Sequence, residues 1–244
     1  MITFNNNKIP AFVRVQKVHV QTLPSIGVNL KSIVGSSGCL AGHTTLGEKK
    51  IICDVIVVMP TGYTLQKCSR ELAVWLRGDN FKLSPLIISD DKEVRYWAKV
   101  NASVDLTDLL VAGQGTIEFV VPSGDCEAVE DVNVSGSNSI TVNNTGTKEV
   151  YPVINLRIGK AVTEGTVLLQ NTTTGDSLSL FGTFKAGDTF TIDCNKNLVK
   201  KGDTLAMNML SLTSKFFNLQ LGKNVISCGN SGTEIAVTYR NKYL

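Results

Sequence analysis

The sequence has 244 residues, an apolar fraction of 43% and a formal net charge of +3. This length fits one large domain or two of ordinary size, and the apolar fraction is sufficient for real cores. No run of about 20 apolar residues occurs, which excludes a membrane-spanning helix. The N-terminus has no basic stretch followed by an apolar segment, so no secretory signal is expected. Residues 1–131 carry 13 basic and 14 acidic side chains, and residues 132–244 carry 11 and 7. Neither half is basic enough to predict tight nucleic-acid binding.

Six cysteines are spread along the chain without a C-x-x-C pair, and the sequence holds only two histidines. Because structural zinc sites need clustered cysteine and histidine ligands, this spacing argues against one. Without export, disulfides are not expected either. The sequence therefore predicts free thiols that are mostly buried as small apolar side chains: Cys39, Cys53, Cys68, Cys126, Cys194 and Cys228.

The first extended segments precede a region rich in glycine and serine. Residues 13–20 alternate apolar and polar with a phase slip at Gln16–Lys17, which predicts a strand with a bulge or two short strands. His19 falls on the polar side, so it is expected to be exposed or at an interface. Residues 26–47 form either a flexible loop or a β-hairpin arm that pairs with a neighbouring subunit. His43 in this segment is interpreted as a loop residue, because no second ligand is near in the sequence.

One amphipathic helix is predicted after a long apolar strand. Residues 50–58 are β-branched and nearly continuous, which indicates a strand buried on both faces. In residues 64–78, apolar side chains recur at spacings of three, four and seven, which places them on one helical face. Thr64 is expected to cap the start of the helix, and Gly78 to end it in the left-handed conformation. The predicted apolar face consists of Leu65, Cys68, Leu72, Trp75 and Leu76.

Two further strands are predicted on either side of a longer one. Leu83–Ile88 is expected to be a strand entered through Pro85, and Asp90–Lys92 is expected to be a turn. Gly113–Val121 is the last strand of this half and is stopped by Pro122. These segments supply the sheet on which the apolar face of the helix can pack.

The segment Val94–Val104 alternates apolar and polar residues and predicts a strand. Trp97 falls on its polar side. Exposed tryptophan is enriched at contact surfaces. Trp97 is therefore either an intersubunit contact or is covered by a loop or by residues 26–47.

A change of composition indicates a domain boundary between Ser123 and Asp131, where the chain becomes polar and acidic. It divides the sequence into residues 1–131 and residues 132–244. The second part has short apolar segments separated by glycine-containing turns and no helix signal, which predicts an antiparallel sandwich. The expected strands are Ser139–Asn143, Val153–Ile158, Thr166–Asn171, Ser177–Phe181, Thr189–Asp193, Lys215–Leu219, Asn224–Cys228 and Glu234–Arg240.

No motif in the sequence predicts catalytic chemistry. The segment Gly113–Gly115 lacks the third glycine of a dinucleotide fingerprint and precedes a strand instead of a helix. A segment that begins at Asp193 starts like a calcium loop, but Leu198 and Thr204 occupy the places that need glycine and glutamate. No G-x-S-x-G elbow occurs. We therefore predict no catalytic, cofactor-binding or metal-binding residue, no cofactor and no enzymatic activity.

Sugar binding is an alternative function for the second half, because sugar sites in β-sandwiches often stack the sugar ring on an exposed tryptophan. Residues 132–244 contain no tryptophan and no histidine. Their phenylalanines mostly fall at alternating, core-like positions, as at Phe181, Phe190 and Phe217. The adjacent Phe216 and Phe217 place one ring outward if they lie in a strand. This composition disfavours a sugar site.

The order of several short motifs is similar to that of a known family. In the first half they are R-x-L-A-x-W-L from Arg70 to Leu76, P-L-I at Pro85–Ile87, D-D-x-x-x-x-Y from Asp90 to Tyr96, and G-x-G-x-I-x-F from Gly113 to Phe119. In the second half they are N-T-G at Asn144–Gly146, Y-P at Tyr151–Pro152, T-T-G at Thr173–Gly175, F-F-x-L-x-x-G-x-N-x-I from Phe216 to Ile226, and Y-R-x-x-Y from Tyr239 to Tyr243. Nearly the whole chain thus resembles the distal tail proteins of long-tailed (siphovirus) phages or prophages of Gram-positive bacteria.

This resemblance implies a mainly β fold. Residues 1–131 would be an N-terminal ring-forming β-sandwich with one α-helix, and residues 132–244 a C-terminal galectin-like antiparallel β-sandwich. The implied function is that of a structural component of the tail tip or baseplate. It would be a homohexameric ring, single or as two stacked rings, with a central channel for DNA in transit. The implied partners are the major tail tube protein, the tail-associated hub protein and, as in some relatives, a receptor-binding protein. The implied location is the virion tail tip, after synthesis in the host cytoplasm and without membrane contact.

The residues themselves leave a second hypothesis open, a monomeric carbohydrate-binding protein that adheres to the cell wall. The two hypotheses differ in stoichiometry and in the role of residues 26–47. A sugar binder needs neither a ring nor an arm. A first domain of nearly neutral charge suits a DNA conduit, because a strongly basic bore would hold phosphates.

Overall fold

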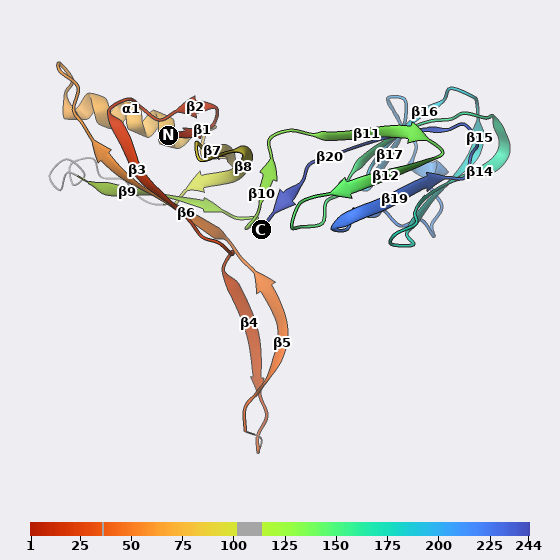
Figure 1. The fold of residues 1–244 in the computed structure, drawn as a ribbon, viewed down its shortest axis with the longest axis horizontal. Helices are drawn as coiled ribbons and strands as arrows, with labels where there is room; N and C mark the ends of the chain where they lie inside the picture. The colour runs from red at the N-terminus through yellow and green to blue at the C-terminus, as the bar shows by residue number, and fades with distance from the viewer. Residues whose placement is uncertain (36, 102–113) are drawn as a thin grey trace. The chain divides into compact units, whose positions relative to one another are not determined.

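A computed structural model describes residues 1–35, 37–101 and 114–244. Within these residues the protein is mainly β, with several antiparallel sheets and one α-helix (Figure 1). The predicted fold class, a mainly β chain with a single helix, is confirmed. The chain divides into two compact units, Met1–Val129 with Leu244, and Glu130–Tyr243.

The first unit is built on an antiparallel sheet with the strand order β2–β1–β7–β8–β9–β6–β3, with β10 paired to β8. A separate pair, β4 with β5, is inserted between β3 and β6. The strands of this unit are β1 (Ile2–Phe4), β2 (Asn7–Lys8), β3 (Val13–Val20), β4 (Ile26–Ser32), β5 (Cys39–Leu46), β6 (Lys49–Val57), β7 (Ser84–Ile88), β8 (Asp91–Val100), β9 (Gly115–Val121) and β10 (Cys126–Ala128).

The single helix α1 (Leu65–Arg77) forms where the periodicity predicts it. The Thr64 hydroxyl accepts a hydrogen bond from the Lys67 amide, which caps the first turn as expected. At the other end Gly78 has φ +57° and ψ −133°. The positive φ favours glycine, but ψ departs from the predicted left-handed helical value. A Cβ at this position would meet the Phe4 ring at 2.9 Å, so the close approach also requires glycine.

The core of the first unit is centred on three aromatic rings that come from three elements. Phe4 of β1, Trp75 of α1 and Phe119 of β9 pack with ring centroids 5.1 to 6.1 Å apart. Cys68 and Leu72 lie on the same helical face as Trp75 and are buried with it. The helix therefore packs its apolar face on the sheet, as its sequence predicts.

The second unit contains two antiparallel sheets, with the orders β11–β20–β13–β16–β17–β18 and β12–β19–β14–β15. Its elements are β11 (Val132–Ser137), β12 (Ser139–Asn144), β13 (Val153–Arg157), β14 (Val162–Asn171), β15 (Ser177–Phe184), β16 (Thr189–Asp193), β17 (Leu198–Lys201), β18 (Thr204–Leu205), the 3-10 turn Met207–Met209, β19 (Gly222–Cys228), β20 (Glu234–Tyr239) and β21 (Lys242–Tyr243).

Both sheets of the second unit contribute to one core, which makes the unit a two-layer sandwich. Leu156, Phe190 and Ile235 come from the larger sheet, and Val167 and Ile226 from the smaller one. All five side chains are buried. Residues between them along each strand alternate to the outer faces, as expected for sheets with one face on a core.

Several predicted strands differ from the structure. Lys215–Leu219 is not a strand: Leu219 forms only an isolated bridge with Val150, although Phe217 is buried as the pattern required. The sequence did not predict β11 and β17, nor the short strands β1, β2, β10, β18 and β21. β6 alternates between fully and partly buried residues instead of being buried on both faces, because its second face is partly open. The predicted ends of two strands at Val104 and Gly113 lie outside the described residues.

Candidate assembly surfaces

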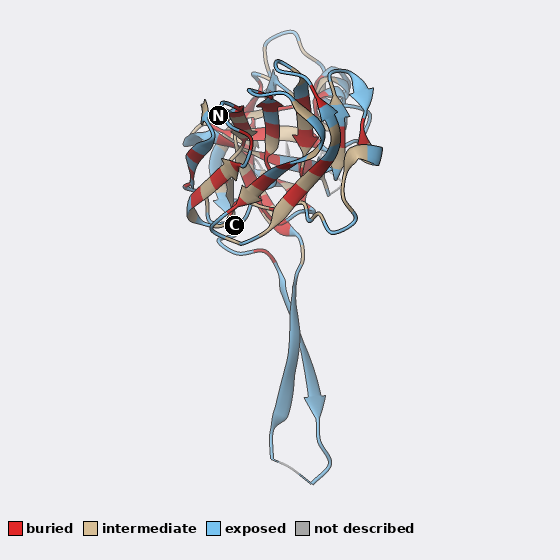
Figure 2. Cartoon of the chain, turned by 90° about the vertical axis from the view of Figure 1, so that its right-hand side faces the viewer, coloured by how far each residue is buried: buried red, intermediate tan, exposed pale blue. Residues whose placement is uncertain are grey.

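Residues 26–46, hereafter the arm, form a β-hairpin made of β4 and β5. The two strands pair from Ile26 with Leu46 to Ser32 with Cys39. Every residue of both strands is exposed, as the uniform pale blue of the hairpin in Figure 2 shows. Of the two alternatives for this segment, the hairpin is confirmed. A two-stranded ribbon by itself is at best marginally stable in water.

The arm has one apolar face. Alternate residues of a strand share a face, and directly paired residues point to the same side of the hairpin. Val28 pairs with Thr44 and Leu30 with Ala41, so the even-numbered residues of β4 lie beside these side chains. We call this face the apolar stripe: Ile26, Val28, Leu30, Ala41 and Leu46. The four larger side chains are 51% to 60% exposed. Contiguous exposed apolar side chains of this kind are typical of contact surfaces.

The register of the arm shifts once, because β5 holds Gly42 and His43 where β4 holds only Asn29. His43 therefore lies in a strand, at an irregular position, and its prediction as a loop residue is wrong. The other histidine, His19, is exposed on β3 as expected, and its Nε2 lies 3.0 Å from Oδ2 of Asp54. The irregularity predicted near Gln16 is present as a register shift between β3 and β6.

Trp97 lies on the face of β8 opposite to the core and is 38% exposed. Its Nε1 donates a 2.8 Å hydrogen bond to Oε1 of Glu127, and the same oxygen accepts two bonds from the Arg95 guanidinium at 2.7 and 2.8 Å. The guanidinium also lies 5.2 Å from the centre of the indole ring. The ring is thus held in one orientation. The fully exposed arm of the same chain does not cover it, and its role in an intersubunit contact stays a prediction.

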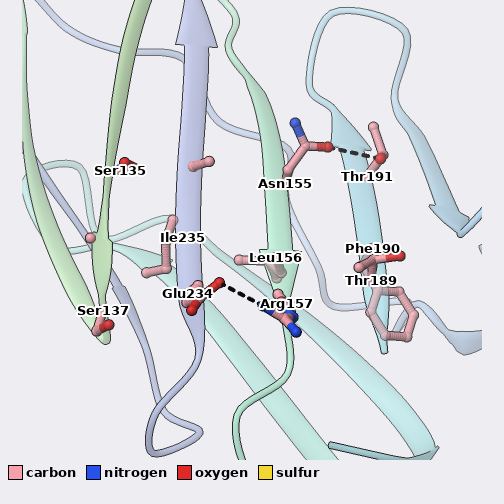
Figure 3. A pocket seen from close by; sticks show the side chains of 12 residues that line it. Ser135, Ser137, Asn155, Leu156, Arg157, Thr189, Phe190, Thr191, Glu234 and Ile235 are labelled. Carbon is pink, nitrogen blue, oxygen red and sulfur yellow. Dashed lines mark hydrogen bonds and ion pairs between the residues drawn. The ribbon is translucent and has the colours of Figure 1, made fainter. Parts of the chain in front are cut away.

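A shallow hollow of about 600 Å³ lies on the outer face of the larger sheet in the second unit (Figure 3). Polar side chains from four neighbouring strands line it. Asn155 accepts a 2.8 Å hydrogen bond from the Thr191 hydroxyl, and Arg157 lies 3.5 Å from Glu234. Ser135 and the other serine and threonine hydroxyls complete a face that is polar and lacks an exposed aromatic ring.

Two of the three phenylalanines predicted for the core of the second unit are buried there, Phe190 and Phe217, each 1% exposed. Phe181 is 51% exposed, so its prediction as a core residue is wrong. It lies on β15, where the neighbouring Leu180 is the buried side chain. The buried positions of β15 therefore lie one residue away from the predicted ones. Phe181 is on the smaller sheet, away from the strands that line the hollow.

The thiols follow the prediction with one exception. All six cysteines are free, five are buried, and Cys39 on the arm is exposed. Burial raises the pKa of the Cys53 thiol to about 12 and that of Cys194 to about 12. Neither residue is therefore a reactive thiolate at neutral pH.

The segment that resembles the start of a calcium loop folds as a turn. The Asp193 carboxylate accepts hydrogen bonds from the backbone amides of Asn195 and Lys196, and the Lys196 ammonium lies 3.3 Å from it. The described residues contain no group of three or more histidine, cysteine, aspartate or glutamate side chains that could hold a metal ion. Among the same residues, no helix has the length and apolar character needed to cross a membrane.

Family models match both halves of the chain. Residues 4–121 match a phage tail protein RIFT-related domain, and residues 145–243 match the C-terminal domain of the siphovirus-type tail component. The protein defined by these two domains is a phage tail component. The chain belongs to the siphovirus distal tail proteins.

One solved structure shares the fold of the chain over its full length. The crystal structure of the phage SPP1 Dit protein (gp 19.1), described as a paradigm of the hub adsorption apparatus in phages that infect Gram-positive bacteria, matches with a TM-score of 0.81. The match covers 100% of this chain and 98% of that one at 18% identity. The structure of the phage P2 baseplate in its activated conformation with Ca matches 93% of this chain and 90% of that one, at 8% identity and a TM-score of 0.45. No curated protein sequence matches the chain.

Two features of these surfaces were not predicted from the sequence. The Glu127 contact with Trp97 joins residues 30 positions apart and needs the pairing of β10 with β8. The apolar stripe needs the register of the hairpin. The alternation of Ile26, Val28 and Leu30 was a visible signal for it, but glycine and serine on both sides obscured it.

Proposed function

We propose that this protein is a structural component of the phage tail tip or baseplate that assembles as a homohexameric ring. Residues 1–131 form the ring domain around a central channel, and residues 132–244 form an outer galectin-like domain. The family match and the fold shared with SPP1 Dit support this proposal. The ring is single or doubled by stacking.

The observation that carries the proposal is the arm. It is a hairpin whose two strands are exposed throughout and whose four larger stripe side chains are 51% to 60% exposed. Fully burying an exposed apolar side chain of this size contributes about 1.5–3 kcal/mol, and each of these side chains has roughly half of its surface left to bury. Four such side chains repeated around a ring provide a strong driving force for contact. The free edges of the hairpin also offer backbone groups to a neighbouring sheet.

The β3 edge of the first unit is less suited to such pairing. Its partner strand β6 meets it through a register shift, and Arg14 and Lys17 place positive charge along it. Bulges and charged side chains are features that protect an edge from adding another strand. This contrast favours the arm as the segment that makes the contact between copies.

The partners follow from the place of such a ring in a tail. We infer contacts with the major tail tube protein on one side and with the tail-associated hub protein on the other. DNA passes through the channel, and the nearly neutral charge of residues 1–131 suits passage better than retention. The protein is made in the host cytoplasm and resides at the tip of the virion tail. The outer domain offers a place for a receptor-binding protein, and the role of the chain is structural, without catalysis.

The arm is tested by changing one of its faces at a time. The variant Val28→Ser/Leu30→Ser removes the centre of the apolar stripe, and the matched control Asn29→Ser/Lys31→Ser changes the intervening positions of β4. Native mass spectrometry is expected to show hexamers for the control and a shift to smaller species for the stripe variant. Equal hexamer content in both proteins would rule out the stripe as the contact.

The monomeric carbohydrate-binding alternative has weaker support. The polar hollow on the second unit could accept hydroxyl groups, but residues 132–244 supply no tryptophan or histidine to it. A monomer would also leave the arm without a partner. A native mass that stays monomeric together with measurable binding of cell-wall polysaccharide would favour this alternative.

A further inference from the structure

The turn that follows β9 approaches the base of the arm very closely. Gly124 lies in this turn with φ +68°, and its amide donates a 3.1 Å hydrogen bond to the carbonyl of Val121. A Cβ built on Gly124 would lie 2.7 Å from the carbonyl oxygen of Gly47 and 2.8 Å from Cβ of Pro24. Only glycine fits here, because both the backbone angle and the distance to the neighbours exclude a side chain.

Pro24 and Gly47 flank the arm on its two sides. Pro24 is buried, whereas Leu23, Ser25 and every residue of β4 are exposed. Burial therefore stops abruptly where the arm leaves the unit. The contact with Gly124 is the point at which the arm is held.

Hydrogen bonds tie the two sides of this base together. The Gly47 amide donates to the carbonyl of Ser25 at 2.7 Å, and the Ser25 amide donates to the carbonyl of Glu48 at 2.9 Å. A displacement of one side must therefore move the other. Beyond this base, neither strand of the arm has a buried residue that would correct its direction.

We propose that Gly124 is a positioning residue that sets the direction of the arm by letting the turn after β9 fit against Pro24 and Gly47. This inference rests on the proposed function, in which the arm reaches a neighbouring copy. A strand rises about 3.3 Å per residue, so the seven residues of β4 span about 23 Å. A rotation of about 10° at the base would move the tip by about 4 Å, which is enough to misplace a side chain in a packed contact.

Gly124→Ala tests the proposal, with Gly62→Ala as the matched control. Gly62 also has a positive φ, +81°, but a Cβ there would meet nothing within 4 Å. The two variants share the backbone penalty and differ in the contact with the arm base. We expect the hexamer fraction of Gly124→Ala to fall at least tenfold while that of the control stays unchanged. A hexamer fraction of Gly124→Ala equal to that of the control would overturn the proposal.

The direction of the arm can be measured independently of assembly. Cys39 is the exposed cysteine and lies on the arm, and Val74→Cys would add a second labelling site on α1, where Val74 is 72% exposed. Pulsed electron–electron distance measurements between two spin labels report the arm direction within one copy. They are made in the Val28→Ser/Leu30→Ser background, which lacks the contact between copies, in samples diluted with unlabelled chain. The distance distribution is expected to shift or broaden in Gly124→Ala and not in Gly62→Ala. An unchanged distribution would overturn the proposal even if the ring were lost.

A second variant keeps the test valid if Gly124→Ala fails to fold. Pro24→Gly removes the pyrrolidine side chain that contacts Gly124 and adds no atoms. It is expected to broaden the same distance distribution. A narrow, unchanged distribution in this variant would contradict the role of the contact. These distances do not depend on hexamer formation, so failure of the proposed ring and failure of this inference give different results.

Discussion

At the scale of single residues, one carboxylate oxygen of Glu127 holds two side chains in place on the outer surface of β8. It accepts hydrogen bonds from the Arg95 guanidinium and from the Trp97 indole, and both the Arg95 and Glu127 side chains are less than one fifth exposed. Charge-assisted bonds in such a partly screened place are stronger than those between fully exposed groups. The arrangement presents the indole ring in a fixed orientation.

Glu127→Ala is expected to lower the free energy of unfolding by about 1–3 kcal/mol, because it leaves the donors of Arg95 and Trp97 without their acceptor. Glu234→Ala is the control, since the Glu234–Arg157 pair is more than 60% exposed on both sides. That change should alter stability by less than about 0.5 kcal/mol. Denaturant unfolding, followed by far-ultraviolet circular dichroism, measures both, because residues 132–244 contain no tryptophan. Equal losses would show that the Glu127 contacts contribute no more than a surface ion pair.

The ion pair of the Asp188 carboxylate is expected to make the stability of the second unit sensitive to acid. The Lys201 ammonium, 2.6 Å away, and the Lys185 amide hold the pKa of Asp188 below its ordinary value of 3.8. Since the folded state has the lower pKa, the stability from this group is fully present above pH 3.8 and is lost as pH falls through the folded pKa. Asp188→Asn should therefore flatten the fall in melting temperature below about pH 4. An identical acid profile in the variant would contradict this contribution.

The thiols give a simple check of burial. A thiol reagent at pH 8 is expected to modify Cys39 rapidly and the five buried cysteines only after unfolding. Counting modified thiols by mass spectrometry in native and denatured protein tests this. Rapid modification of Cys53 in the native protein would contradict its place in the core.

At the scale of elements, α1 is the part of the first unit whose packing is best defined. Leu72 is 2% exposed and lies on the face that contacts the sheet. Leu72→Ala is expected to cost about 2–5 kcal/mol, because it removes buried atoms and leaves a cavity. The control Val74→Ala changes an exposed position on the same helix and should stay within about 0.5 kcal/mol. Thermal melting of the two variants measures the difference, and equal melting temperatures would contradict the packing described here.

The sequence predicts the elements whose signal is local. The apolar period of helix α1 and its Thr64 cap depend only on residues close together in the sequence. The bulge of β3 is likewise visible as a phase slip in its apolar and polar alternation. Lys215–Leu219 is a segment whose local pattern predicts a strand that does not form. Phe217 and Leu219 alternate as in a strand, but Leu219 pairs only at an isolated bridge with Val150. Pairing depends on distant residues, which the local pattern cannot contain.

The candidate surfaces were less predictable than the fold. The glycine- and serine-rich composition of residues 26–47 left loop and hairpin equally open, and only the register shows that Val28 and Leu30 lie beside Ala41 on one face. The approach of Gly124 to Pro24 joins segments 100 residues apart and has no local signal. Such contacts depend on tertiary structure, so sequence patterns alone do not identify them.

At the scale of the whole molecule, the proposed function depends on assembly into a ring, which a single chain does not display. The proposal of several copies rests on a hairpin exposed along both strands, on the half-exposed side chains of the apolar stripe and on the match to a family of tail components. Closed rings satisfy such contacts without leaving a free end. The arm would then stabilise the assembly without contributing to the fold of its own unit.

The most direct test of this account is the native mass of the full chain, measured by native mass spectrometry together with negative-stain images of the same sample. If the protein forms the proposed ring, particles of six chains or a multiple of six are expected, each with a central hole. A particle of 26.3 kDa, the mass of one chain, that persists at high protein concentration would contradict self-assembly into a ring.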